Sequence, residues 1–474
     1  MQSHNPFPQA PPPTSTLQTR GDKMVAVMVG LPARGKSYIS RRICNFMHFF
    51  YNVPCKTFNV GNYRRNLANS AFQTADFFDP SNKEALALRN KASELAMRDL
   101  IEWMNQVAPT PQEPNSNKFV SGDFGALGVF DATNSTVERR HWIREQLKPL
   151  GVKVIFIESI CNDEALIEQN ILASKVGGKD YFGVDDAQAV NDFRARIYQY
   201  QRTYEQLSNE FEPGVAWIKV VDAGRNVSVN NVRGFLPSRI AQFLMNINTT
   251  RRSIYFTRHG QSEYNVAGKI GGDSGLSEHG EEYAHKLAEW ASKDLVKDGR
   301  GNPTLVRLWT SSLKRAVDTV KYIPHPPVHI NGVEWVQMRP KVFRNLDEIF
   351  AGVCDGLSNA EIAIKFPNEA AAREGNKFTY RYPRGESYQD LIARLEPLVH
   401  EIERQREPIL IVSHQAVLRC LFAYFMGIPR EDCVNVSIPL NTVIKVRPTS
   451  GECTAERFCL LQTPPDVEDE PSSH

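Results

Sequence analysis

The sequence has little net charge and no long apolar run. Lysine and arginine together number 56 and aspartate and glutamate 54, which leaves a formal net charge of +2. This near balance gives no bulk attraction to nucleic acid or to an acidic membrane surface. No apolar run reaches the ~18–20 residues of a membrane-spanning helix, and no charged-then-apolar leader opens the chain. We therefore expect a soluble, cytoplasmic protein that binds neither nucleic acid nor membrane.

The cysteines lack the paired spacing that marks a metal site. The 8 cysteines are scattered along 474 residues, and no internal repeat is present. In a chain of this length such cysteines are typical of reduced, mostly structural thiols. The length exceeds what one hydrophobic core usually serves, so the sequence predicts two domains.

Composition suggests where these domains begin and end. Residues 1–23 are rich in proline, glutamine, serine and threonine, which predicts a disordered amino-terminal tail. A polar break at residues 248–252 separates a first domain, 24–248, from a second, 249–446. The remaining residues, 447–474, are polar and acidic, and we expect them to form a loose tail.

Short β-branched runs alternate with longer helical patterns in both domains. This alternation predicts α/β folds with mainly parallel sheets and helices on both faces, that is, two three-layer α/β domains. The expected strands are Met24–Val29, Thr57–Val60, Leu127–Phe130, Val152–Ile157, Val215–Val221, Ile254–Thr257, Leu305–Trp309 and Ile409–Val412. The expected helices are Ser37–Phe50, Ala85–Met104, Val137–Leu147 and Ala187–Leu207.

A glycine-containing loop follows the first strand. Residues 30–37 read GLPARGKS and lead into an amphipathic helix, which is the setting that a P-loop requires. Gly30 and Gly35 let the backbone turn its N–H groups toward phosphate oxygens, and the helix start adds its positive dipole end. Lys36 can then bridge the β- and γ-phosphates, and Ser37 can bind Mg²⁺. The alternative is a loop that merely connects the strand to the helix.

Asp131 stands at the end of another predicted strand in the first domain. A carboxylate at this edge can hold Mg²⁺ beside a P-loop, although a strand-end aspartate alone is more often a helix cap. Several cations in the same domain would together suit a phosphorylated acceptor, because a guanidinium group matches phosphate oxygens. Each of them alone is better explained as part of a solvated helix face. They are Arg64, Arg65, Arg89, Arg139, Arg140, Lys175, Arg194 and Arg196.

A second candidate site lies at the strand ends of the second domain. The first strand there ends in Arg258 and His259, and a later strand leads into His414. Because open α/β sheets bind ligands at the carboxyl ends of their strands, we expect the two histidines to meet. Arg315 could clamp the same phosphate, and Glu348 is a candidate proton donor.

These residue types suit transfer of a phosphoryl group onto the protein. A neutral imidazole nitrogen of His259 can attack phosphorus in line. Arg258, Arg315 and His414 would offset charge on the equatorial oxygens. A protonated Glu348 can give a proton to the leaving oxygen and then, as a carboxylate, activate water. The sequence therefore pairs phosphoryl donation from ATP with phosphoryl removal through a phosphohistidine.

Over roughly residues 24–446 the chain resembles the 6-phosphofructo-2-kinase/fructose-2,6-bisphosphatase family, whose second half is similar to the histidine phosphatase/phosphoglycerate mutase fold. The resemblance implies phosphorylation of fructose 6-phosphate at O2 by ATP and hydrolysis of the 2-phosphate of fructose 2,6-bisphosphate, which together control glycolytic flux. It also implies a homodimer. The motifs that carry it are GLPARGKS (30–37), GNYRR (61–65), FDATN (130–134), ESICND (158–163), RHGQSE (258–263), GGDSGLS (271–277), RYPRGESYQD (381–390) and SHQAVLRC (413–420).

The resemblance also implies roles for individual residues. ATP with Mg²⁺ would serve the kinase half, with the metal at Ser37 and Asp131, and the phosphatase half would need no cofactor. Catalytic positions would be Lys36, Asp131, Cys161, His259, Glu348 and His414. ATP-binding positions would be Gly30, Ala33, Arg34, Gly35, Lys36, Ser37, Tyr38, Asn170 and Lys175. Fructose 6-phosphate would bind at Arg64, Arg89, Thr133, Arg139, Lys175, Arg196 and Tyr200. Fructose 2,6-bisphosphate would bind at Arg258, Asn265, Gly271, Arg315, Arg373, Lys377, Tyr388, Gln415 and Arg419.

Two residues depart from the family pattern. Asn359 stands where the family usually has a substrate-contacting tyrosine, and Phe350 where an aspartate commonly follows the Glu-Ile pair. These departures leave open a second interpretation, in which the second domain binds sugar phosphate or a partner with little turnover. A third interpretation is a mutase that returns the phosphoryl group to a bound sugar or acid.

Overall fold

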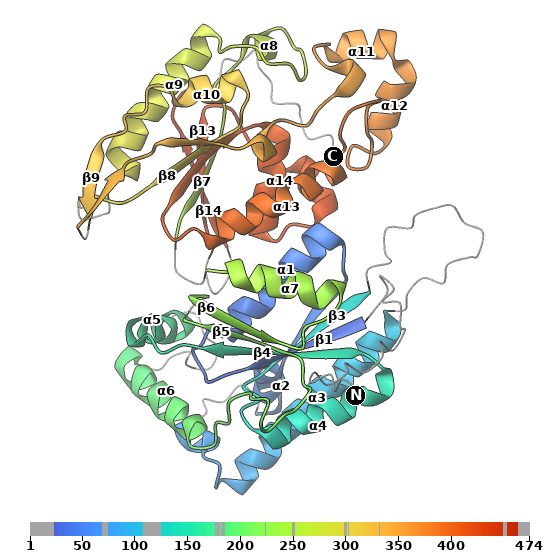
Figure 1. The fold of residues 1–474 in the computed structure, drawn as a ribbon, viewed down its shortest axis with the longest axis vertical. Coiled ribbons are helices and arrows are strands. Elements are labelled where there is room, and N and C mark those ends of the chain that lie inside the picture. Colours follow the sequence, from blue (N-terminus) through green and yellow to red (C-terminus); the bar gives the residue numbers. More distant parts are fainter. Residues whose placement is uncertain are drawn as a thin grey trace, which may run out of the picture.

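Two α/β units are stacked along the long axis of the molecule, and helices of both units meet between the two sheets (Figure 1). The computed structural model describes residues 23–68, 74–107, 125–175, 181, 185–222, 224–248, 252–297, 301, 303–330, 332–448 and 453–462. Residues 1–22 of the expected amino-terminal tail lie outside these ranges, and Lys23 already belongs to the first strand.

The first unit is built on a 6-stranded sheet with the strand order β2-β3-β1-β4-β5-β6. Strand β6 is antiparallel to β5, and the other neighbours are parallel. The strands are β1 (Lys23–Val29), β2 (Cys55–Asn59), β3 (Ala126–Asp131), β4 (Lys153–Ile160), β5 (Trp217–Val221) and β6 (Asn226–Asn230). The helices are α1 (Lys36–Tyr51), α2 (Val60–Leu67), α3 (Lys83–Gln106), α4 (Val137–Leu147), α5 (Glu164–Lys175), α6 (Asp186–Gln201) and α7 (Phe235–Asn246).

Strand β1 shows why this sheet has helices on both faces. Its side chains are buried along nearly the whole length of the strand and alternate between two cores. Met24, Ala26 and Met28 pack with α1 and α7, whereas Val25 and Val27 pack with α3 and α4. Continuous apolar strands of this kind are stable only between two layers of helices. The predicted three-layer α/β architecture is thus confirmed.

The second unit is built on another 6-stranded sheet, with the order β11-β8-β12-β7-β13-β14. Strands β13 and β14 are antiparallel to their neighbours, and the rest are parallel. The strands are β7 (Ile254–Arg258), β8 (Arg307–Thr310), β11 (Pro340–Val342), β12 (Ile409–Ser413), β13 (Thr442–Arg447) and β14 (Thr454–Cys459), and a separate hairpin consists of β9 (Pro327–Ile330) and β10 (Val333–Val336). The helices are α8 (Glu263–Val266), α9 (Glu278–Trp290), α10 (Lys314–Val320), α11 (Asn359–Lys365), α12 (Pro367–Gly375), α13 (Tyr388–Arg404) and α14 (Gln415–Met426).

Shorter helical segments connect these elements. The 3₁₀ segments are η1 (Ala75–Phe78), η2 (Lys148–Leu150), η5 (Arg344–Leu346), η6 (Gly352–Cys354) and η7 (Arg430–Asn435), and η4 (Ala291–Leu295) is a π-helical turn after α9. In the described part of the chain no helix is both long and apolar enough to span a bilayer.

Several element limits differ from the expectations. Helix α6 ends at Gln201 instead of Leu207, because Glu205 binds the loop before α4 through its backbone N–H and its carboxylate. Strand β8 covers Arg307–Thr310, two residues later than its predicted start. The expected loose segment after Arg447 contains the edge strand β14, which pairs along the length of β13. Its side chains are mostly exposed, so it carries none of the apolar alternation that signals a strand.

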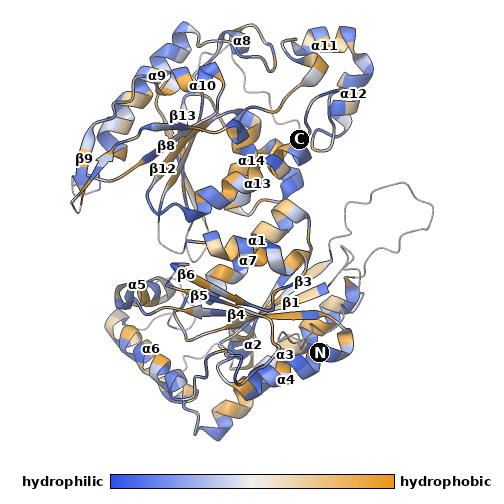
Figure 2. Cartoon of the chain, in the orientation of Figure 1, coloured by the Kyte–Doolittle hydropathy of each residue, from blue (hydrophilic) through white to orange (hydrophobic). Residues whose placement is uncertain are grey.

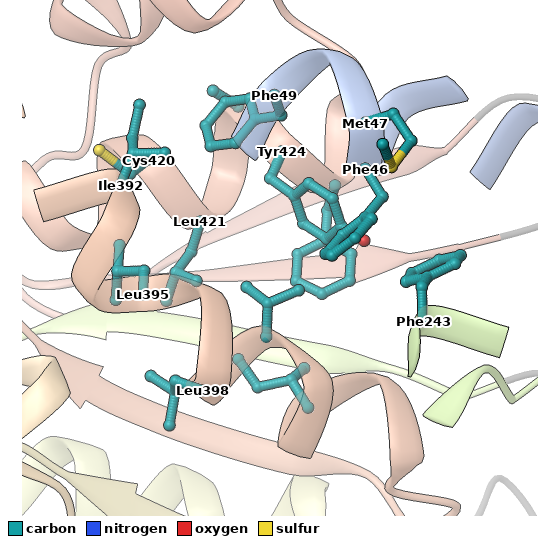
Figure 3. Packing of buried hydrophobic residues seen from close by; sticks show 14 of the residues in the cluster. Phe46, Met47, Phe49, Phe243, Ile392, Leu395, Leu398, Cys420, Leu421 and Tyr424 are labelled. Atoms are coloured by element: carbon teal, nitrogen blue, oxygen red, sulfur yellow. The ribbon is translucent and has the colours of Figure 1, made fainter. Parts of the chain in front are cut away.

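The two units share one hydrophobic core instead of meeting at a thin interface. Helices α1 and α7 pack against α13 and α14, and buried residues from all four helices belong to one cluster. Figure 3 shows the rings of Phe46, Phe243 and Tyr424 within it, and the Phe46 and Phe243 rings are stacked at 4.6 Å. Figure 2 shows that α14, inside this layer, is largely hydrophobic, whereas the outer helices α4 and α9 are largely hydrophilic.

Candidate functional sites

The glycine-containing loop folds as a phosphate cradle at the carboxyl end of β1. Gly30 has φ 136° and an ideal Cβ there would lie 2.5 Å from the carbonyl oxygen of Ser159, so only glycine fits. Gly35 has φ 77° and caps the start of α1, which points its first N–H groups into the loop. The Asn170 amide donates to the carbonyl of Ala33 (3.1 Å) and holds the loop from α5.

Lys36 is buried under this loop and bends back toward it. Its Nζ donates to the carbonyl oxygen of Leu31 at 2.6 Å. Burial lowers the pKa of Lys36 to about 8, although the Asp131 carboxylate opposes that shift. A phosphate ligand would supply the negative charge that this buried ammonium lacks.

Asp131 is the centre of a polar cluster formed by two strand ends and the start of helix α1. Its Oδ2 accepts hydrogen bonds from Ser37 Oγ (2.7 Å) and from Asn59 Nδ2 (2.6 Å). Asn59 ends β2 and Asp131 ends β3, so the parallel sheet brings them together at one edge. The oxygens of Ser37 and Asp131 are hard ligands of the type that Mg²⁺ prefers, and they lie within hydrogen-bond distance of each other.

Four of the predicted acceptor residues gather around Phe78, a residue that sequence reasoning missed. The guanidinium of Arg196 lies 3.9 Å from the ring centroid of Phe78, and that of Arg64 lies 5.0 Å from it. The Tyr200 ring is 5.8 Å away, and Arg89 donates to the Phe78 carbonyl oxygen at 3.2 Å. Phe78 thus brings cations from α2, α3 and α6 close to one another. The only feature of the sequence that points to Phe78 is that it belongs to an apolar Phe-Phe pair after a polar stretch.

Other predicted kinase residues take separate positions. Arg139 lies over the Trp142 ring at 4.1 Å, and burial lowers its pKa to about 10. Cys161 follows β4, and burial raises the pKa of its thiol, which therefore stays neutral. The backbone of Thr133 accepts from Gly30 N at 2.9 Å, which ties the FDATN segment to the cradle. The side chain of Lys175 is outside the described part of the structure.

The side chains of two candidate positions contact other parts of the fold. The Tyr38 hydroxyl donates to the Asn248 carbonyl (3.4 Å) and the ring packs on the shared core, so its side chain lies away from the cradle. Arg140 is 0% exposed and pairs with the Glu212 carboxylate at 2.6 Å. A buried guanidinium that is paired in this way within the protein stabilises the fold.

The second site places two histidines side by side at the ends of β7 and β12. The ring centroids of His259 and His414 are 4.9 Å apart, and both side chains are buried. The backbone N–H of His259 donates to the Ser413 carbonyl at 2.9 Å, so parallel pairing of the two strands fixes this neighbourhood. Burial and nearby arginines lower the pKa of both imidazoles well below its usual value, and both rings are neutral at pH 7.

The hydrogen bonds of His259 determine where its proton lies. Its Nδ1 is 2.7 Å from the carbonyl oxygen of Gly260, which can only accept, so Nδ1 carries the hydrogen. Its Nε2 accepts from Nε of Arg315 at 3.1 Å. The lone pair on Nε2 therefore faces the guanidinium that would bind a phosphate, which is the arrangement that a nitrogen nucleophile needs.

Glu348 lies on a loop that Arg394 holds in place. Burial lowers the pKa of Arg315, and the Glu348 carboxylate opposes that shift. Arg394 donates to the carbonyl oxygens of Arg344, Asn345 and Asp347 at 3.0–3.2 Å and so fixes the approach of Glu348. Sequence reasoning did not single out Arg394, which only the folded loop explains.

Most of the remaining predicted contacts of the second site lie in or next to helices α8, α12, α13 and α14. Tyr388 and Arg419 meet at 3.3 Å, and Gln415 begins α14 directly after His414. Asn265 closes a capping box with Ser262, and the carbonyl of Gly272, next to Gly271, accepts from Arg315 at 2.7 Å. Arg373 and Lys377 lie in and just after α12, which Figure 1 shows at the same end of the molecule as α8.

The two departures from the family pattern lie at the surface. Phe350 is 49% exposed, and its backbone, not its ring, is held by Glu386. Asn359 is an exposed residue in the first turn of α11. Neither position disturbs the buried contacts of the histidine pair.

Fold and sites together define a class: a P-loop kinase unit joined to a unit with a two-histidine phosphate site. The sequence profile described as 6-phosphofructo-2-kinase matches residues 13–109 and 115–251, and that of the histidine phosphatase superfamily (branch 1) matches residues 254–460. The chain is 41% identical over 434 residues to 6-phosphofructo-2-kinase/fructose-2,6-bisphosphatase 4 of Macaca fascicularis, covering 92% of this chain and 84% of that one. It is 40% identical over 441 residues to 6-phosphofructo-2-kinase/fructose-2,6-bisphosphatase of Caenorhabditis elegans, covering 92% and 89%.

The chain therefore belongs to the 6-phosphofructo-2-kinase/fructose-2,6-bisphosphatase family.

Proposed function

We propose that this chain makes fructose 2,6-bisphosphate in its amino-terminal unit and hydrolyses it in its carboxyl-terminal unit. One observation carries the proposal: a P-loop with a buried lysine and a neutral histidine with its Nε2 lone pair facing an arginine occur in a single chain. Family membership supplies the identity of the sugar. The reaction pair is ATP-dependent phosphorylation of fructose 6-phosphate at O2 and hydrolysis of that same ester.

In the kinase reaction the protein positions two anions against each other. The Gly30–Ser37 loop and the start of α1 hold the triphosphate, and Lys36 offsets charge between the β- and γ-phosphates. Mg²⁺, when bound by Ser37 and Asp131, would neutralise further phosphate charge. Arg64, Arg89, Arg196 and Tyr200 around Phe78 would hold fructose 6-phosphate so that its O2 hydroxyl approaches the γ-phosphorus.

In the phosphatase reaction Nε2 of His259 attacks the phosphorus of the 2-phosphate. The P–O2 bond breaks as the N–P bond forms, and Glu348 gives its proton to the departing sugar oxygen. Arg258, Arg315 and His414 stabilise the charge on the phosphoryl oxygens. Glu348, now a carboxylate, takes a proton from water as that water attacks phosphorus, which releases inorganic phosphate and restores His259.

The wider proposal includes a cytoplasmic homodimer, which rests on the family resemblance alone. Sedimentation of the purified chain tests the dimer against the chain mass of 53.6 kDa. A species of that single mass at micromolar concentration would contradict it.

Two substitutions test whether the reactions belong to separate sites. Lys36→Met removes the cation that spans the phosphates, so ADP formation with fructose 6-phosphate should be lost while hydrolysis persists. His259→Ala should abolish acid-labile labelling by fructose 2,6-bisphosphate carrying a radioactive 2-phosphate, and it should leave the kinase reaction intact. Equal loss of both activities in either variant would contradict separate sites. Recovery of the label in inorganic phosphate, rather than in another sugar, separates a phosphatase from a mutase.

A further inference from the structure

Ser311 touches the second histidine of the phosphatase site from a fully buried position. It follows β8, and its Oγ lies 2.7 Å from Nε2 of His414. The same Oγ accepts the backbone N–H of Leu313 at 3.2 Å, and the backbone N–H of Ser311 donates to the Val412 carbonyl at 3.2 Å. Ser311 is therefore fixed on two strands at once and has little freedom to turn away from the imidazole.

The hydrogen bonds around His414 favour one position for its proton. Among the described residues, Nδ1 of His414 has no hydrogen-bond partner. The only hydrogen bond of the His414 ring to these residues is the one between Nε2 and Ser311. If Nε2 carried the proton, the Ser311 hydroxyl hydrogen and the Nδ1 lone pair would both be buried without partners. If the Ser311 hydroxyl donates to Nε2, only one group, the Nδ1–H, is left without a protein partner. Because an unsatisfied buried polar group is destabilising, the second arrangement, which has one such group instead of two, is favoured.

We propose that Ser311 is a positioning residue of the phosphatase site, whose hydroxyl donates to Nε2 of His414 and so keeps the proton of that ring on Nδ1. This inference rests on the proposed phosphatase function. The Nδ1–H is a buried donor beside His259, with ring centroids 4.9 Å apart, and protein atoms leave it for an acceptor that arrives with the substrate. A phosphoryl oxygen bound at His259 is such an acceptor. Ser311 thus makes a neutral imidazole into a donor to the phosphoryl group without adding a positive charge.

A serine-to-alanine substitution tests this role against a matched neighbour. Ser311→Ala frees the ring to rotate and to move its proton, so we expect phosphoenzyme formation from fructose 2,6-bisphosphate to slow roughly 10- to 100-fold. KM should stay within about twofold, because the ground-state contacts of the arginines remain. The control is Thr310→Val, since the buried Thr310 hydroxyl has no hydrogen-bond partner among the described residues. It should keep the wild-type rate, and an unchanged rate in Ser311→Ala would overturn the proposal.

A measurement on the unsubstituted protein decides the case even if Ser311→Ala folds poorly. Histidine labelled with ¹⁵N gives distinct shifts for protonated and unprotonated ring nitrogens, and the His414 signals are those that vanish in His414→Asn. Protonated Nδ1 with Nε2 as acceptor supports the proposal, and protonated Nε2 overturns it. Since this readout needs no turnover, it separates failure of the Ser311 role from failure of the proposed phosphatase function.

Discussion

At the scale of single residues, the same side-chain type serves opposite purposes in this protein. Arg140 forms a buried ion pair with Glu212 and stabilises the fold, whereas the guanidinium of Arg196 lies over the ring of Phe78. The difference is the partner: a carboxylate neutralises the charge of an arginine, whereas an aromatic ring orients the guanidinium through its face. An arginine held on a ring can still bind an anion.

Phe78 should therefore influence one substrate and not the other. Phe78→Leu removes the ring under Arg64 and Arg196 while keeping an apolar side chain, and a cation–π contact contributes about 0.5–2 kcal/mol. We expect KM for fructose 6-phosphate to rise roughly 3- to 30-fold and KM for ATP to stay within about twofold. Phe156→Leu is the matched control, because Phe156 is equally buried in β4 and packs in the apolar core. Equal changes in both KM values would argue against this role.

The two buried histidines should make the protein less stable in mild acid. Their pKa values are lowered in the folded state, so below the ordinary value of about 6.5 the unfolded chain binds more protons than the native one. The free energy of unfolding should then fall as the pH drops from 7 to 5, by about 1.4 kcal/mol per pH unit for each proton involved. Urea unfolding at several pH values measures the slope. His414→Asn should reduce the slope, and replacement of the exposed His141 should not.

At the scale of elements, helices α1 and α14 each begin at one of the two candidate sites. Gly35 caps α1 under the phosphate cradle, and His414 is the residue before α14. Helix α9 passes so close to the histidine loop that two glycines face each other: an ideal Cβ on Gly260 would lie 2.5 Å from the Gly280 carbonyl oxygen. The contact from the helix side is tighter: an ideal Cβ on Gly280 would lie 2.1 Å from the carbonyl oxygen of Gln261. The position of α9 thus sets the position of the loop.

A methyl group at Gly280 should displace that loop. Gly280→Ala cannot be accommodated without moving backbone, and small displacements of catalytic groups can cost up to about 100-fold in rate. We expect phosphatase turnover to fall roughly 10- to 100-fold with the kinase rate unchanged. The control is Gly275→Ala, because a Cβ there meets only the flexible end of Lys314, at 3.6 Å. Wild-type turnover in Gly280→Ala would show that the loop adapts.

At the scale of the whole molecule, a buried polar cluster lies inside the shared core. Glu403 at the end of α13 pairs with Arg42 of α1, and its second carboxylate oxygen is 3.4 Å from Arg252, which precedes β7. The Tyr424 hydroxyl, near the end of α14, donates to Glu403 at 2.9 Å. One carboxylate therefore joins the P-loop helix to two helices of the phosphatase unit. We therefore expect the two units to unfold together.

Neutralising this carboxylate should destabilise both units at once. Glu403→Gln leaves two buried arginines without their counter-charge, and loss of one partner of a buried pair costs about 3–5 kcal/mol. We expect a lower melting temperature and simultaneous loss of both activities on heating. Glu401→Gln is the control on the same helix, since its pair with Arg404 is largely exposed and should contribute less than about 1 kcal/mol. Two well-separated transitions in the wild-type protein would contradict the shared core.

The sequence by itself determined the P-loop, the histidine loop and the α/β class, because these depend on local order: glycines at fixed spacing, and apolar strands that each end in a polar residue. It also indicated that His259 and His414 meet, since parallel strands end at the same edge. Only the tertiary structure decided what depends on partners distant in the chain. Phe78 under the arginines, Ser311 on His414 and Glu403 between the units have no local signature. The polar strand β14 escaped prediction because backbone pairing with β13, and not side-chain burial, holds it in place.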